Sequence, residues 1–115
     1  MKRLVVILNE THSLMPDQER VILEAFPGFA IEKLSVPSAG WTLPQIKKQV
    51  EVVIGDAVVI FASPIPAMIL LLAGSRAGVG VHVLHNDRRI AKEIRNPDGS
   101  VRIIHTVSPE GWEIV

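Results

Sequence analysis

The chain is predicted to fold as one α/β domain over residues 1–115, a Rossmann-like three-layer sandwich with a mainly parallel sheet and a C-terminal β-hairpin. Two observations predict this fold. Apolar runs at 4–8 and 57–62 do not alternate with polar residues, which is typical of parallel strands covered on both faces. Helix-start signals follow each of the first three predicted strands, whereas a turn signal alone separates the last two. With right-handed crossovers, the order β-α-β-α-β-α-β and a final hairpin gives the sandwich.

The first half of the chain is predicted to contain two strands and two helices. A strand at 4–8 runs into five polar residues, and Pro16 then opens a helix that Pro27-Gly28 ends. Residues 29–36 alternate weakly, which suits a strand nearer the sheet edge. The sequence TLPQ at 42–45 is a capping box that begins the second helix. The apolar stripe of this helix is Ile46, Val50, Val53 and Ile54, and Gly55 closes it.

The central stretch, 55–74, reads GDAVVIFASPIPAMILLLAG. It predicts a buried strand over 57–62, a tight turn at Ser63-Pro64 and a helix from about Pro66 to Ala73, with Ser63 placed to cap the helix and Gly74 as its stop. The run from Ala57 to Ala73 carries no charged residue and could therefore also be a membrane span. Its length is at the short end of the roughly 17–25 residues that a bilayer requires. Two prolines and a serine within the run favour the strand, turn and helix of a soluble core.

The last third of the chain has a different pattern. A fourth strand is predicted at 79–84, followed by the polar turn 85–89. Two further strands, 88–95 and 101–107, are joined by NPDGS at 96–100, which is a strong turn signal. We expect the arms of this hairpin to extend the sheet, and the short tail 112–115 to pack or pair.

Composition excludes several classes of function. Twelve basic and twelve acidic residues balance, so a nonspecific duplex binder is not expected. Aromatic residues are scarce, with no Tyr, which argues against a stacking platform for single strands. The absence of cysteine excludes thiolate metal sites, thiol catalysis and disulfides, and is compatible with a cytoplasmic protein. The apolar run near the N-terminus is too short for a signal peptide.

Polar side chains gather where the predicted parallel strands end. The carboxyl ends of parallel strands lie along one edge of the sheet, where open α/β sheets bind their ligands. We therefore expect four loops to meet in one crevice. The candidate site residues are Asn9, Thr11, His12, Ser13, Ser38, Ser63, His85, Asn86, Arg88 and Arg89. No close-spaced ligand pair accompanies His12, His85 and Asp87, so no metal is expected.

Structural roles remain open for these residues. The 9–13 run also suits a loop that caps a helix, and Ser63 suits a cap better than a nucleophile because the G-x-S-x-G elbow is absent. Arg88 and Arg89 also suit solvated charges at the start of a hairpin. A structural position is expected for His82, a surface or edge position for His105, and a place over the core, rather than a stacking role, for Trp112.

Four features together resemble a known family. They are the short first strand that runs into 9–13, Gln18 soon after it, the strand–Ser63-Pro64–helix centre, and the polar, basic turn 85–89 that leads into a hairpin. This layout resembles the small stand-alone CRISPR-associated Rossmann-fold (CARF-like) proteins, and is similar to the single-domain ring nucleases that bind cyclic oligoadenylate. The resemblance covers nearly the whole chain.

The resemblance implies a homodimer whose two-fold axis passes through a cyclic-oligoadenylate site. It implies contacts to the ring from Asn9, Thr11, His12 and Ser13 after the first strand, and from His85, Asn86, Arg88 and Arg89 after the fourth. Cleavage would proceed without a metal or other cofactor, by attack of a ribose 2′-hydroxyl on the adjacent phosphate. His12 or His85 would serve as acid–base group, and Arg88 or Arg89 would hold the phosphorane charge. Neither loop contains lysine, so basic contacts rest on the two arginines.

Two other classes of function remain open. The same crevice could sense or sequester a nucleotide without cleaving it. Alternatively, the chain could be a structural or interaction protein whose loops only cap helices and whose hairpin pairs with a partner.

Overall fold

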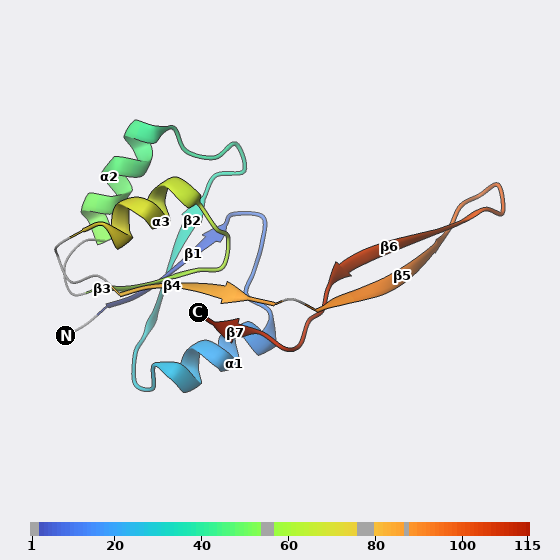
Figure 1. Ribbon diagram of the computed structural model, residues 1–115, viewed down its shortest axis with the longest axis horizontal. Coiled ribbons are helices and arrows are strands. Elements are labelled where there is room, and N and C mark those ends of the chain that lie inside the picture. The colour runs from blue at the N-terminus through green and yellow to red at the C-terminus, as the bar shows by residue number, and fades with distance from the viewer. Residues whose placement is uncertain (1–2, 54–56, 76–79, 87) are drawn as a thin grey trace.

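The computed structural model describes residues 3–53, 57–75, 80–86 and 88–115. Predicted features at Ile54, Gly55, Val79 and Asp87 lie outside the described residues. The helices and strands follow the predicted order (Figure 1). They are β1 (Arg3–Asn9), α1 (Pro16–Ala25), β2 (Ile31–Val36), α2 (Leu43–Val53), β3 (Ala57–Phe61), α3 (Pro66–Ala73), β4 (Gly80–His85), β5 (Arg89–Arg95), β6 (Val101–Val107) and β7 (Glu113–Ile114).

The main sheet has five strands in the order β2-β1-β3-β4-β7. The first four are parallel, and β7 runs antiparallel to β4, pairing Leu84 with Ile114 and His85 with Glu113. The central strands β1 and β3 are almost wholly buried, as the apolar runs predicted. The weakly alternating β2 lies at the sheet edge, also as predicted. The chain is thus a mixed α/β protein, compatible with a Rossmann-like fold.

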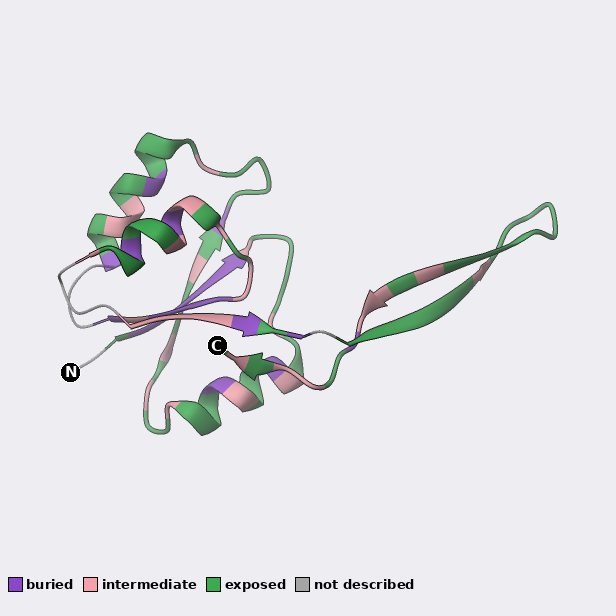
Figure 2. Cartoon of the chain, viewed as in Figure 1, coloured by how far each residue is buried: buried purple, intermediate pink, exposed green. Residues whose placement is uncertain are grey.

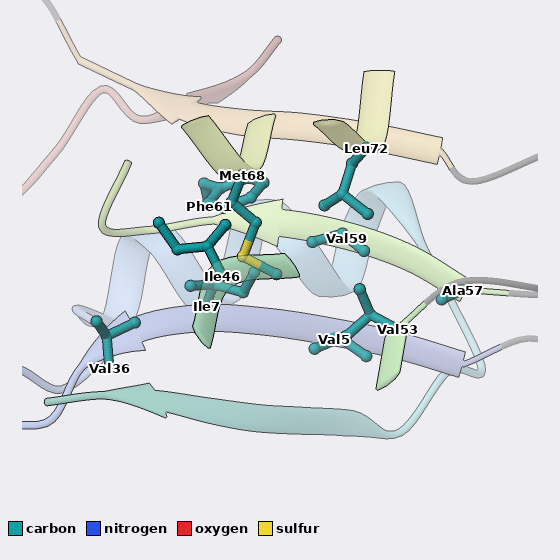
Figure 3. Close-up of a cluster of buried hydrophobic side chains, with 10 residues drawn as sticks. All are labelled: Val5, Ile7, Val36, Ile46, Val53, Ala57, Val59, Phe61, Met68 and Leu72. Atoms are coloured by element: carbon teal, nitrogen blue, oxygen red, sulfur yellow. The ribbon is translucent and has the colours of Figure 1, made fainter. Parts of the chain in front are cut away.

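Helices cover both faces of this sheet. Figure 3 shows Ile46 and Val53 of α2 and Met68 and Leu72 of α3 packed on strand residues such as Phe61. On the opposite face, Ile22 of α1 packs with a second set of buried residues, Leu4, Val6, Ile60 and Leu84. Alternate residues of β1 and β3 therefore enter different clusters, which explains why these strands show no polar alternation.

The central stretch forms the predicted strand, turn and helix. β3 ends at Phe61 and α3 begins at Pro66, where the missing N–H of proline costs no helical hydrogen bond. Gly74 is the C-cap of α3, as expected. Among the described residues, no helix is both long enough and apolar enough to cross a bilayer.

The N-terminal cap predicted for α2 is present, whereas the one predicted for α3 is not. In α2, the Thr42 N–H donates to Gln45 Oε1 (2.8 Å) and the Gln45 N–H donates to Thr42 Oγ1 (3.4 Å), which forms the predicted capping box. The prediction that Ser63 caps α3 is wrong. The N-cap of α3 is Ile65, because the chain runs two residues further before it turns into the helix. Ser63 instead accepts a hydrogen bond from β1.

The hairpin does not extend the main sheet, which corrects the expectation from sequence. β5 and β6 form their own two-stranded sheet, with Arg89 opposite Val107 and Arg95 opposite Val101. The physical reason lies at β4, whose outer edge is taken by β7. The hairpin therefore projects from the body as a separate ribbon (Figure 1). It raises the radius of gyration to 16.7 Å, against about 13 Å for a compact domain of this length.

Candidate functional site

The carboxyl ends of β1, β2 and β3 are joined into one polar edge. The Asn9 N–H donates to Ser63 Oγ (2.9 Å), and the N–H groups of Ala62 and Ser63 both donate to the Ile7 carbonyl. The Glu10 N–H donates to the Val36 carbonyl (2.8 Å). The Glu10 carboxylate accepts from the Ser38 N–H (3.0 Å). Three of the four predicted loops, those that carry Asn9, Ser38 and Ser63, therefore meet at this edge.

The loop after β1 is held in shape by its own first residue. Asn9 Oδ1 accepts hydrogen bonds from the Thr11 N–H (3.0 Å) and the Thr11 hydroxyl (2.7 Å). The Asn9 carbonyl accepts from the His12 N–H (2.9 Å). This is an Asx turn, in which a side chain takes the place of a backbone acceptor. It fixes the backbone of Thr11 and His12 while both side chains remain exposed.

The His12 pocket, of about 420 Å³, opens beside this loop. Its polar lining comes from Thr11, His12 and Ser13 of the β1–α1 loop, and the opposite wall comes from Val107 and Trp112 near the C-terminus. The indole N–H of Trp112 is buried and donates no hydrogen bond within the part of the chain that the structure describes. Imidazole and hydroxyl groups here lie at the edge where open α/β sheets take their ligands.

A second pocket, of about 600 Å³, surrounds Arg88. Its other charged residues are Asp17 and Arg20 of α1 and Glu110 of the tail. The Arg88 side chain lies over Gly111, where a Cβ would come within 2.9 Å of Arg88 Cδ and Nε. Gly111 has φ +86°, so glycine serves here both the turn and the close approach of the arginine.

Asp17 links the two sides of this pocket, α1 and the tail, through hydrogen bonds. Its Oδ2 accepts from the N–H groups of Gly111 (3.0 Å) and Trp112 (3.1 Å), and its Oδ1 accepts from Arg20 Nε (2.8 Å) and Nη2 (2.7 Å). The hydrogen bond from the Trp112 N–H, followed by that from the Arg20 guanidinium, lowers the pKa of the Asp17 carboxyl. The contact between Asp17 and the tail is not predicted from the sequence, because no local pattern indicates a partner 94 positions away.

In the loop after β4, Asn86 and Arg89 form hydrogen bonds to backbone groups at the base of the hairpin. Asn86 is buried, and its Nδ2 donates to the carbonyls of Ser108 and Glu110 (both 2.9 Å). Its Oδ1 accepts from the Arg88 N–H (2.9 Å). Arg89 Nη1 donates to the carbonyls of Asn86 and Arg88 (both 3.0 Å). His85 is exposed at the end of β4. Among the described residues of this loop, Arg88 and His85 thus have the side chains with most freedom to meet a ligand.

The predicted site residues fall into three groups. Thr11, His12 and Ser13 line the His12 pocket, Arg88 lines the second pocket, and neither pocket is lined by the remaining six. Since β3 lies between β1 and β4, the loops that follow β1 and β4 start about 10 Å apart. Both pockets adjoin the first turn of α1 and the tail, through Met15 and Trp112 in one and Pro16 and Gly111 in the other.

His82 and His105 lie where the sequence predicts, the first packed in the fold and the second at the surface. His82 packs against Phe26, with ring centroids 5.6 Å apart, and His105 is exposed on β6. Within the described ranges, no three His, Asp or Glu side chains are grouped as a metal site would require. Comparison with protein-family models, curated proteins and solved structures finds no significant match to this chain.

Proposed function

We propose that this protein binds cyclic oligoadenylate at the carboxyl edge of its parallel sheet, as a cytoplasmic ring nuclease of CRISPR antiviral signalling with a Rossmann-like three-layer architecture. One observation carries the proposal: Thr11, His12 and Ser13 line a pocket at that edge, on a loop whose backbone Asn9 fixes. Ligands of open α/β sheets bind outside the carboxyl ends of the strands. Hydroxyls and an imidazole suit a phosphodiester, since they can donate to phosphate oxygens and exchange protons.

Each side chain has a definite part in this proposal. The Thr11 and Ser13 hydroxyls donate to phosphate oxygens or to ribose. His12 takes the proton of a ribose 2′-hydroxyl as that oxygen attacks the adjacent phosphorus. The bond from phosphorus to the 5′-oxygen breaks, and the 5′-oxygen takes a proton, which leaves a 2′,3′-cyclic phosphate and a free 5′-hydroxyl. Arg88 supplies positive charge to the phosphorane oxygens.

The proposal includes a second copy of the chain. His12 and Arg88 line different pockets, so a single chain offers each phosphate few contacts. A two-fold dimer presents each group twice to a ligand that has two-fold symmetry itself. The net charge is zero, so affinity must come from such local contacts.

A specific observation favours a second candidate, binding without cleavage. Arg88 shares its pocket with Asp17 and Glu110, whose negative charges oppose a phosphate. His12 and Arg88 are also not brought into one pocket, whereas in-line cleavage requires base and charge clamp around one phosphate. On this candidate the protein senses or sequesters the ring.

One experiment separates the two candidates. The protein is incubated with cyclic tetra- and hexa-adenylate, with and without a chelator, and the products are separated by chromatography. Ring nuclease activity predicts linear products ending in a cyclic phosphate, unaffected by the chelator and abolished by His12→Ala. His105→Ala, which removes an exposed histidine from β6, is the matched control and should retain activity at protein concentrations where the dimer is complete. An intact ring that co-elutes with the protein favours sensing. If neither ring binds and neither is cleaved, both candidates are contradicted.

A further inference from the structure

The hairpin of β5 and β6 stands apart from the body of the protein, and we call residues 89–107 the arm. Each of its strands has seven residues, which gives a ribbon about 23 Å long. Figure 1 shows the arm projecting beyond the helices and the main sheet, and Figure 2 shows it exposed along most of its length. The arm meets the body at its base, where the Ser108 N–H donates to the Arg88 carbonyl (3.3 Å) and Asn86 binds the following turn.

The arm carries large aliphatic side chains on both of its faces. The strand register places Val101 and Ile103 on one face with Ala91, whereas Ile90 lies on the other face with Ile94 and Ile104. Ile90, Val101 and Ile103 are 46%, 51% and 63% exposed. A two-stranded ribbon is marginally stable on its own in water and gains stability when a face is covered. Within the described residues, the outer edges of β5 and β6 are also unpaired, as in strands that join another chain.

The net charges of the arm and of the rest of the chain indicate which surface would attract the arm. Its 19 residues include four basic and two acidic side chains, whereas the rest of the chain has eight basic and ten acidic. The arm is therefore positive and the body negative by the same amount. Two arms placed against each other would bring like charges together, but an arm placed on the body of a second copy joins opposite charges.

We propose that the arm docks on the body of a second copy of this chain, and that the second copy's arm docks reciprocally on the first. Such an exchange is closed by a two-fold axis and covers one face of each arm. The arm leaves the sheet at the carboxyl end of β4, the same edge as the His12 pocket. The proposal therefore gives the homodimer of the proposed function an interface, although it does not depend on the identity of the ligand.

The first test measures assembly by sedimentation equilibrium. The wild-type protein should be dimeric at micromolar concentration, and added salt should weaken the dimer because opposite charges join it. Val101→Glu and Ile103→Glu should each raise the dissociation constant at least about tenfold, because each places a charge in an apolar contact. Ile103→Leu keeps the aliphatic surface and should remain as dimeric as the wild type. Circular dichroism of each variant should show an unchanged body.

The second test identifies the surface that the arm meets. The chain has no cysteine, so Ile103→Cys provides a single thiol for a benzophenone label. Illumination should give a cross-linked dimer whose joined peptides pair the arm with residues outside 89–107. Cross-links from arm to arm alone, or a wild-type monomer at tens of micromolar, would overturn the proposal. A dimer that both glutamate variants leave intact would also overturn the proposal. Such a dimer could still bind a ring across its two-fold axis. Failure of arm docking and failure of the proposed function are therefore distinguishable.

Discussion

Asp17 is a single side chain that connects the first turn of α1 to the tail. Four hydrogen bonds converge on it, two from backbone N–H groups and two from Arg20. The pKa of its carboxyl is lowered, chiefly by the Trp112 N–H. A carboxyl with a lowered pKa stabilises the folded state above its unfolded pKa, near about 4, and loses that contribution as pH falls through the folded value.

Asp17→Asn should therefore lower the melting temperature at neutral pH, and the difference from the wild type should shrink as pH falls below about 4. Thermal unfolding by circular dichroism between pH 2 and pH 7 measures this difference. The carboxyls of Glu32 and Asp98, whose pKa values are lowered by Arg3 and Ser100, are common to both proteins and cancel. Glu19→Gln, an exposed neutralisation in the same turn, should show no such trend. A difference that stays constant with pH would contradict the assignment.

Gly111 offers a second prediction at the scale of one residue. Gly111→Ala and Gly28→Ala should each destabilise the fold by about 1–2 kcal/mol, because both glycines have positive φ. Only at Gly111 would the new Cβ meet Arg88, since nothing lies within 4 Å of the Cβ position at Gly28. Chemical denaturation should thus give similar losses, whereas calorimetric titration should give weaker ring binding for Gly111→Ala alone. Equal ring affinities for Gly111→Ala and Gly28→Ala would indicate that Arg88 does not contact the ligand.

Substitution of Arg88 and Arg89 tests whether these side chains bind the ring. A charge-assisted bond to phosphate contributes about 1.5–3 kcal/mol. Since a two-fold dimer loses two such bonds at once, Arg88→Ala should weaken ring binding at least about a hundredfold. Arg89→Ala should have a smaller effect than Arg88→Ala, because the Arg89 guanidinium already donates to two carbonyls. At concentrations where the dimer is complete, Arg95→Ala and Arg102→Ala should change affinity little. Wild-type binding by both the Arg88 and Arg89 variants would place the site elsewhere.

At the scale of elements, the sequence predicted those whose signals are local. The start of α1 at Pro16, the capping box of α2, the strand and helix around Ser63-Pro64 and the turn at 96–100 all depend on neighbouring residues, and they lie where expected. The two-residue strand β7 has no periodicity to detect, and its pairing with β4 follows from tertiary contact. The role of Ser63 was missed for the same reason, since its partner Asn9 is 54 residues away.

Helix α3 allows a prediction with a control on the same element. Leu72 is 1% exposed and Leu70 is 73% exposed, although both stand in an apolar helix without charge. Leu72→Ala should lower the free energy of unfolding by about 2–5 kcal/mol. Leu70→Ala should change it by less than about 0.5 kcal/mol. Urea denaturation measures both values, and equal losses would contradict the burial of Leu72 between α3 and the sheet.

At the scale of the whole molecule, the sequence predicted which loops share an edge but not how that edge is divided. Parallel strand order alone brings Asn9, Ser38 and Ser63 together. The tail then returns beside α1 and pairs with β4, and His12 and Arg88 line separate pockets. That path is set by Asp17 and Asn86 holding distant backbone groups, and no pattern of neighbouring residues encodes it.

On the proposed function, a symmetric ring binds at this edge across two copies of the chain. Isothermal titration of the protein with cyclic tetra- and hexa-adenylate, in chelator at protein concentrations where the dimer is complete, tests it most directly. We expect saturation at one ring per two chains for one of these rings, with that binding weakened by Arg88→Ala and unchanged by removal of metal. Absence of binding for both rings, or saturation at one ring per chain, would contradict it.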